Sequence, residues 1–139
     1  MLLLATMLNG VAALAICLAG ARYCTASVPM DYHARIFEAD GLTLSPATTL
    51  VLRTFYRGLG ALFLATGLAV AWLTVSVWQT DHIGTRSVLF AVGAGPAVVL
   101  AVLPRLVEQH TGVRTPWRLS AAVAGLLGLA FLIGVLGAS

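Results

Sequence analysis

Lysine is absent from this sequence, and acidic residues are scarce: five Asp and Glu stand against eight arginines. Only 9% of the residues are charged and 60% are hydrophobic, whereas soluble domains usually carry about 25% charged residues. A chain with so little polar surface cannot cover itself in water. The composition therefore excludes an ordinary soluble domain and indicates a membrane protein.

The motifs that carry catalysis or metal binding are missing as well. Cys17 and Cys24 form neither a CxxC motif nor a Cys/His ligand spacing, so we expect them to be small packing residues. The sequence contains no GxSxG, HExxH or P-loop motif. We therefore predict no catalytic residue, no metal site and no cofactor, and we do not expect an enzyme.

Four long apolar runs occupy most of the chain, at residues 2–20, 58–77, 87–103 and 119–138. Each is close to the ~20 residues that a helix needs to cross ~30 Å of hydrocarbon. Runs of this length without alternation are helices and not barrel strands. The predicted fold class is an all-α membrane protein with four transmembrane helices in a bundle, forming a single domain over residues 1–139.

The four runs also limit what the titratable residues can do. All acidic and histidine residues lie outside them, which weighs against a proton-coupled pump and against a haem clamped between histidines inside the bundle. The first run lacks a basic start, and Arg22 follows it. We therefore expect a retained span and not a cleaved signal peptide.

The arginines are distributed unequally between the connections. Seven of the eight lie in the first and third loops or beside them, and only Arg86 lies on the other side. The positive-inside rule then predicts that the first and third loops are cytoplasmic and that both termini lie on the opposite side. Because the arginines flank apolar runs, this explanation replaces a nucleic-acid interface, and we predict no nucleic-acid partner.

The first loop carries a short helical pattern at residues 29–40. Pro29 suits a first helical turn, Gly41 suits the position after a helix end, and Asp31 can pair with Arg35 one turn later. We expect a short amphipathic helix that lies at the membrane surface.

The stretch LRTFYRGLG places Arg53 and Arg57 directly before the second span. Ser45 and Pro46 form a helix start upstream of them. A helix that begins there is longer than the hydrocarbon core is thick, so the two arginines lie in the headgroup layer.

Helical spacing also predicts which way these arginines face. Arg53 and Arg57 share one stripe with Gly60 and Gly67, so we expect them to lean over the cytoplasmic mouth of the bundle. Because two neighbouring like charges repel each other, we expect an anion beside them. It is either a lipid phosphate or other ligand, or one of four carboxylates on the same side: Asp31, Glu38, Asp40 and Glu108.

The third span contains Gly93, Gly95 and Pro96 near its middle. Proline removes a backbone hydrogen bond, and a helix break must face protein or a wet cavity. The pattern is compatible with a simple kink and with the broken helices at which transporters bind substrate. In the first span, Asn9 should face another helix and form a hydrogen bond there.

Two stretches carry a resemblance to a known family: AGARY at the end of the first span and LRTFYRGLGALFLATGLAV in the second. With the four-span layout, they resemble small bacterial four-helix membrane proteins of the DoxX-like type. The resemblance implies a four-helix fold in a bacterial inner membrane. Some members are linked to quinone-dependent oxidation as accessory subunits. The insert VPMDYHARIFEADG departs from that pattern, and no activity is carried over.

Three functions remain open. The leading hypothesis is a non-catalytic accessory, assembly or lipid-binding subunit, with membrane lipids and a partner membrane protein or a second copy as partners. The second is a redox-linked subunit that binds quinone or another amphipathic ligand at the cytoplasmic mouth, and the third is a small transporter that uses residues 93–96. The candidate ligand- or anion-binding residues are His33, Glu38, Arg53, Tyr56, Arg57 and Glu108.

Overall fold

The computed structural model describes residues 1–137, and within these it contains helices and no strand. The elements are α1 (Leu2–Thr25), α2 (Asp31–Ala39), α3 (Pro46–Thr80), α4 (Ile83–Thr111) and α5 (Trp117–Leu136). All but the short α2 are long and apolar enough to cross a membrane. The predicted fold class, four membrane-spanning helices with a short helix in the first loop, is confirmed.

The helix boundaries follow local sequence signals. The hydroxyl oxygen of Ser45 accepts a hydrogen bond from the backbone N–H of Thr48 at 3.1 Å, and Pro46 is the first residue of α3. This helix has 35 residues, so it is roughly 50 Å long and exceeds the hydrocarbon core as predicted. The fourth span was predicted to reach residue 138, which lies outside the described residues, and α5 ends at Leu136.

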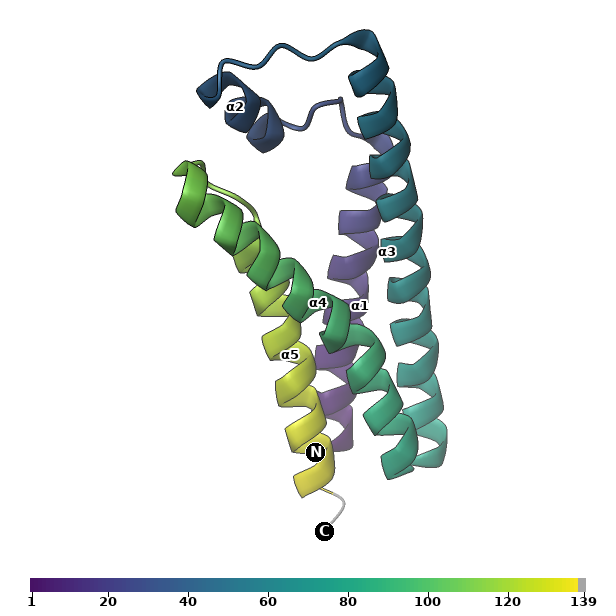
Figure 1. The fold of residues 1–139 in the computed structure, drawn as a ribbon. Helices are drawn as coiled ribbons and strands as arrows, with labels where there is room; N and C mark the ends of the chain where they lie inside the picture. Colours follow the sequence, from purple (N-terminus) through teal and green to yellow (C-terminus); the bar gives the residue numbers. More distant parts are fainter. Residues whose placement is uncertain (138–139) are drawn as a thin grey trace.

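The helices form a bundle that is closed at one end and splayed at the other (Figure 1). α1 and α3 lie side by side along most of their length, and α5 packs against α1. α4 starts beside α3, at the end of the bundle where α1 begins and α5 ends, and crosses over to α5. At the far end, α4 and α5 separate from α3, and α2 lies across the opening. We call this the α2 end and the other the terminal end.

The α1–α3 contact is built on glycines. A Cβ atom added to Gly60 would lie 2.8 Å from the carbonyl oxygen of Gly20, and one added to Gly20 would lie 2.9 Å from that of Gly60. The two backbones therefore touch, which only residues without a side chain permit. Gly67 makes the same kind of contact with Cys17. The face of α3 that carries Gly60 and Gly67 is thus a packed face.

The direction predicted for the two arginines is wrong. Tyr56 is 2% exposed and occupies the buried position one turn before Gly60, whereas Arg53 and Arg57 are exposed. At about 100° per residue, Tyr56 lies inside the arc formed by the buried residues of α3, whereas Arg53 and Arg57 lie beyond one edge of that arc. An aromatic side chain, and not a guanidinium group, fills the mouth of the α1–α3 contact.

α4 continues without interruption through Gly93, Gly95 and Pro96. Gly93 is buried against Leu127 and Val70 of the neighbouring helices, and Gly95 faces open space. The segment is therefore a continuous helix that contains a proline and not a broken one.

At the terminal end, Arg86 is only 6% exposed and forms an ion pair with Asp81. Its Nε and Nη1 atoms, and Oδ1 of Asn9, are buried without a hydrogen-bond partner in the described part of the chain. Asn9 thus faces the bundle as predicted, beside Arg86 in a cavity of about 10 Å³. Its predicted hydrogen bond to another helix is absent for Oδ1 in that part of the chain.

Candidate ligand site beneath α2

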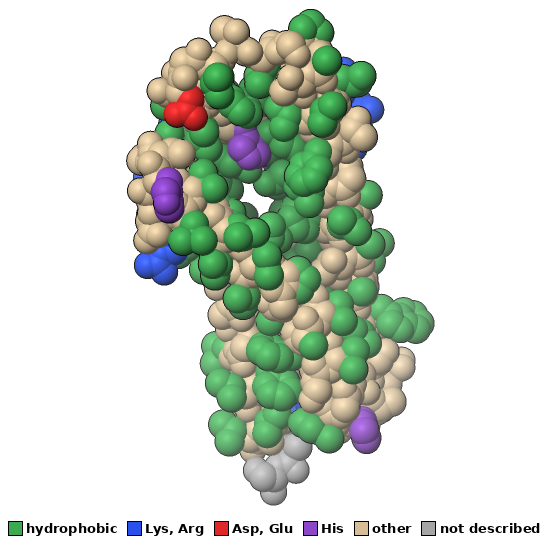
Figure 2. Space-filling view, in the orientation of Figure 1, with side chains coloured by type: hydrophobic (Ala, Val, Ile, Leu, Met, Phe, Trp, Pro, Cys, Tyr) green, Lys and Arg blue, Asp and Glu red, His purple; other side chains and the backbone are tan. Residues whose placement is uncertain are grey.

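A cavity of about 600 Å³ lies beneath α2, between α1 and the start of α5. We call it the α2 cavity. Figure 2 shows the molecule hollowed at this level, with an opening visible between the splayed helices. The opening follows from the fold, because α4 leaves α3 and follows α5 at the α2 end.

The walls of the α2 cavity change from polar to apolar with depth. Its mouth is lined by Arg22, Tyr23, Tyr32, Arg35 and Arg114. A smaller, almost wholly apolar cavity of about 60 Å³ shares Ala15, Ala19 and Leu119 with it and reaches Phe63, Pro96 and Val123. We call this the inner pocket. The two cavities therefore adjoin each other, and the inner pocket extends toward the middle of the bundle.

Positive charge dominates the mouth. Arg22 comes from the end of α1, Arg35 from α2 and Arg114 from the α4–α5 connection, and Asp31 is the only acidic residue in the wall. None of these three arginines has an ion-pair partner within residues 1–137. The predicted Asp31–Arg35 pair is not among the ion pairs of this part of the chain.

A cluster of aromatic side chains holds α2 over the cavity; its members are Tyr23, Tyr32, His33 and Tyr56. The hydroxyl group of Tyr56 contacts Nδ1 of His33 and accepts a hydrogen bond from the backbone N–H of Met30 at 3.4 Å. The hydroxyl groups of Tyr23 and Tyr32 are 3.1 Å apart. The His33 and Tyr56 rings stack with centroids 5.3 Å apart. The cluster ties α2 to both α1 and α3.

Burial shifts the titration of the two α2 members of this cluster. It raises the pKa of the Tyr32 hydroxyl far above its ordinary value of 10.0, with a further contribution from the hydrogen bond to Tyr23. It lowers the pKa of His33 below its ordinary 6.5. Both side chains are therefore neutral near pH 7, and the positive charge at the mouth comes from the arginines alone.

The structure divides the predicted ligand-binding residues between different places. Tyr56 and His33 are brought together in the aromatic cluster. Arg53 and Arg57 lie on the other side of Tyr56, in a separate pocket of about 470 Å³ against the linker between α1 and α2. Glu38 is exposed on α2.

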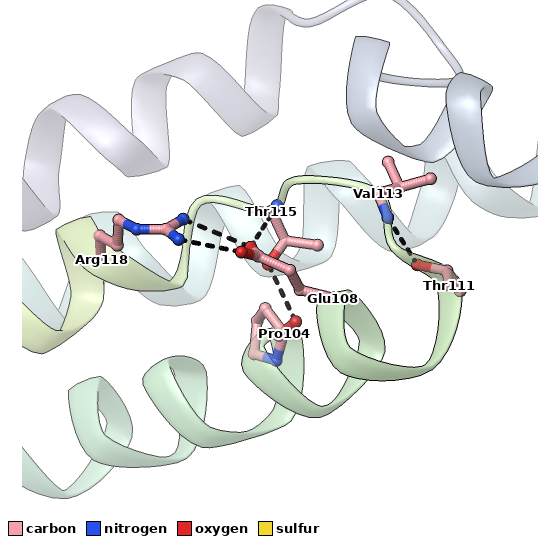
Figure 3. A network of polar contacts seen from close by, with 6 residues as sticks. All are labelled: Pro104, Glu108, Thr111, Val113, Thr115 and Arg118. Carbon is pink, nitrogen blue, oxygen red and sulfur yellow. Dashed lines mark hydrogen bonds and ion pairs between the residues drawn. The ribbon is translucent and has the colours of Figure 1, made fainter.

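Glu108 belongs to a different network (Figure 3). Its carboxylate accepts hydrogen bonds from the backbone N–H of Thr115 at 2.8 Å and from Arg118 at 3.0 Å. The Thr115 hydroxyl donates to the carbonyl oxygen of Pro104 at 2.9 Å. Glu108 therefore closes the α4–α5 turn. Within the described residues, none of the four candidate carboxylates pairs with Arg53 or Arg57, so the expectation of a carboxylate partner is not met there.

Comparisons with family models, curated proteins and solved structures give no match to this chain. The DoxX-like resemblance and its implied links therefore stay predictions from the sequence, and the site must be interpreted from its own geometry.

The residues at the mouth of the α2 cavity were not identified as a set from the sequence. Arg22 and Arg114 were counted only as topological charges and Arg35 also as a helical partner of Asp31, because no spacing relates the three arginines. The one available signal was that they flank three different elements at the same end of the bundle. Their convergence depends on α2 folding back over α1, which the sequence pattern does not specify.

Proposed function

We propose that this chain is a non-catalytic integral membrane protein that binds a membrane lipid or a similar amphiphile in the α2 cavity, as an accessory or lipid-binding subunit. The observation that carries the proposal is the gradient along the cavity wall, from arginines and phenols at the mouth to aliphatic side chains in the inner pocket. The volume lies within the ~300–1,000 Å³ typical of small-molecule sites.

In this proposal the mouth of the α2 cavity lies at the depth at which a lipid presents its headgroup. The mouth is at the arginine-rich end, which the positive-inside rule assigns to the cytoplasm, in our proposal that of a bacterial inner membrane. Guanidinium groups and neutral phenols bind oxygen atoms, and the aliphatic wall suits a hydrocarbon chain. The subunit function further proposes a partner membrane protein or a second copy, and crosslinking in native membranes that captures neither would contradict that part.

The proposal can be tested by blocking the cavity. Ala19 lines both the α2 cavity and the inner pocket, so Ala19→Phe should fill the passage between them. The matched control is Ala61→Phe, at an exposed position of α3. Native mass spectrometry of the purified proteins should find co-purifying lipid on the wild type and on Ala61→Phe but not on Ala19→Phe. Equal lipid retention by all three proteins would contradict the proposal.

A quinone is the second candidate ligand, because Tyr23 and Tyr32 line the mouth and one of their hydroxyl groups, the one that accepts in the contact between them, can donate to a carbonyl oxygen. The measurement is a titration with a short-chain quinone. Tyr32→Phe should weaken binding, while Arg57→Ala should not, since Arg57 lines a different pocket. Negligible affinity for the quinone in the wild type, in Tyr32→Phe and in Arg57→Ala would exclude this candidate.

A further inference from the structure

Five arginines at the α2 end have no ion-pair or ring partner within residues 1–137, and they form two groups. Arg53 and Arg57 line the pocket against the α1–α2 linker. Arg22, Arg35 and Arg114 line the mouth of the α2 cavity. The remaining two are occupied: Arg105 and Arg118 lie over the ring of Trp117, and Arg118 also pairs with Glu108.

The three arginines of the α2 cavity come from three segments that only the fold brings together. A positive-inside signal requires the charges to be on one side of the membrane, and it does not require them to surround one cavity. Their mutual repulsion weakens the packing of α2 over the cavity unless an anion lies between them. Asp31 alone cannot neutralise three guanidinium groups.

We infer that the α2 cavity selects amphiphiles with an anionic headgroup, whose phosphate or carboxylate oxygens are bound by Arg22, Arg35 and Arg114 while an apolar chain enters the inner pocket. This inference rests on the proposed lipid-binding function and names the chemical class of the ligand. Guanidinium groups bind such oxygens through paired, charge-assisted hydrogen bonds. A zwitterionic headgroup brings its own cation and leaves the arginine charge uncompensated.

The aromatic cluster supports this selection. Tyr23 and Tyr32 present hydroxyl groups at the same mouth. The Tyr32 hydroxyl keeps its proton at neutral pH, since burial raises its pKa. One of the two hydroxyl groups donates to the other, which leaves the second as a donor for a headgroup oxygen. The two phenols also tie α2 to α1 through the contact between their hydroxyl groups, so that Arg35 is held over the cavity.

The second arginine group supplies the matched control. The pocket of Arg53 and Arg57 is of comparable size, about 470 Å³, and its walls are the end of α1, the α1–α2 linker and Tyr56. It shares Tyr23 with the α2 cavity but no lining residue with the inner pocket. It offers charge at the same end of the molecule without a path for a hydrocarbon chain. Changes to Arg22, Arg35 and Arg114 should therefore abolish headgroup selectivity, and changes to Arg53 and Arg57 should not.

The experiment compares ligands on the delipidated, purified protein by native mass spectrometry. The probes are phosphatidylglycerol, oleate, zwitterionic phosphatidylcholine and, as a headgroup without a tail, glycerol phosphate. The proteins are the wild type, Arg22→Gln/Arg35→Gln/Arg114→Gln, Arg53→Gln/Arg57→Gln and Ala19→Phe. Helical content measured by circular dichroism shows that each is folded, and the single change Arg35→Gln, at an exposed residue, replaces the triple variant if that variant does not fold.

The wild type should bind phosphatidylglycerol or oleate at least about ten-fold more tightly than phosphatidylcholine. The triple variant should lose this preference and Arg53→Gln/Arg57→Gln should keep it. Tighter binding of phosphatidylglycerol than oleate assigns a phosphate headgroup and the reverse assigns a carboxylate; either result supports the inference.

Two results would overturn the inference while leaving the proposed function intact. One is equal binding of phosphatidylglycerol and phosphatidylcholine that Ala19→Phe abolishes, and the other is an equal loss of preference in both arginine variants. Binding of glycerol phosphate as tightly as phosphatidylglycerol would overturn it in favour of a soluble anion. If no lipid binds the wild type at all, the proposed function fails together with the inference.

Discussion

Tyr56 is the residue that organises the α2 end. It is buried at the mouth of the α1–α3 contact, with its ring edge-on to Tyr23 at 5.8 Å and its hydroxyl group against His33. Buried phenols need a polar partner for the hydroxyl group, and α2 provides it from both His33 and the Met30 backbone. The position of α2 over the cavity therefore depends on a side chain of α3.

Removing this hydroxyl group should loosen α2 without unfolding the bundle. A net hydrogen bond is worth about 1 kcal/mol, so Tyr56→Phe should raise the opening equilibrium of α2 about five-fold. Hydrogen exchange of the amides in residues 31–39 measures this opening. Phe55→Leu, at an exposed neighbouring position, is the control and should exchange like the wild type. Unchanged exchange in Tyr56→Phe would show that the hydroxyl group does not hold α2.

The docking of α2 over the cavity should also depend on pH through His33. Burial holds the pKa of His33 below its ordinary 6.5 when α2 is docked, so the undocked state takes up the proton first as the pH falls. The contribution of neutral His33 to docking is therefore complete above about pH 6.5 and is lost as the pH falls below that value. Amide exchange in α2 should accelerate between about pH 7.5 and pH 5 beyond the intrinsic change in exchange rate.

The pH effect has its own pair of controls. His33→Gln should abolish the additional acceleration, because the titrating group is gone. His110→Gln, at an exposed position near the end of α4, should retain it. A pH profile that is the same in His33→Gln and in the wild type would assign the dependence to another group.

At the scale of the helices, the α1–α3 contact is the tightest in the bundle because it brings two backbones together. A Cβ at Gly60 would meet Sγ of Cys24 at 2.5 Å and two backbone atoms, Cys24 N and Gly20 O, at 2.8 Å. The backbone atoms cannot move without separating the helices. The contact therefore tolerates no added methyl group at this position.

Gly60→Ala should destabilise the bundle by about 1–3 kcal/mol, the usual cost of overpacking a filled interface. Gly58→Ala is a close control, since a Cβ at that position meets nothing within 4 Å. Alanine has the higher helix propensity, so the control should be neutral or slightly stabilising. Unfolding in mixed micelles with rising SDS content measures both, and equal stability of the two variants would contradict the close contact.

The sequence predicted the helices better than their arrangement. Apolar length and the Ser45–Pro46 cap were sufficient for α3, since these signals are local. The crossing of α4 from α3 to α5 depends on side-chain packing between distant segments, such as Gly93 against Leu127, which no periodicity encodes. The α2 cavity exists because of that crossing. The sequence therefore places each of its arginines near the same end of the bundle but does not predict that they line one cavity.

Local geometry also explains the three misplaced charges. Arg53 and Arg57 were placed on the stripe of Gly60 and Gly67 by alternating steps of four and three residues, but the buried face of α3 is centred to one side of that stripe and includes Tyr56 instead. Glu108 was expected at the bundle mouth, and it instead closes the turn to α5 through Thr115 and Arg118. A carboxylate seven residues from a backbone donor gives no helical pattern from which this pairing could be predicted.

For the whole molecule, the distribution of free charge is more unequal than the sequence alone suggests. Arg86, the single arginine of the terminal end, is buried and neutralised by Asp81. At the α2 end, five arginines have no partner in the described part of the chain. The positive-inside rule counts arginines and not net charge, so the Arg86–Asp81 ion pair leaves the predicted orientation as it stood: seven arginines against one.

Cysteine labelling in intact bacterial cells that express the protein tests this orientation. The background is Cys17→Ala/Cys24→Ala, with one new cysteine in each variant: Thr43→Cys at the α2 end or Gln79→Cys at the terminal end, both at exposed positions. A membrane-impermeant maleimide should label Gln79→Cys in intact cells and should label Thr43→Cys only after permeabilisation. The reverse pattern would place the arginine-rich end outside. The α2 cavity would then draw its ligand from the outer leaflet, where anionic phosphate headgroups would have to be supplied by a different lipid pool.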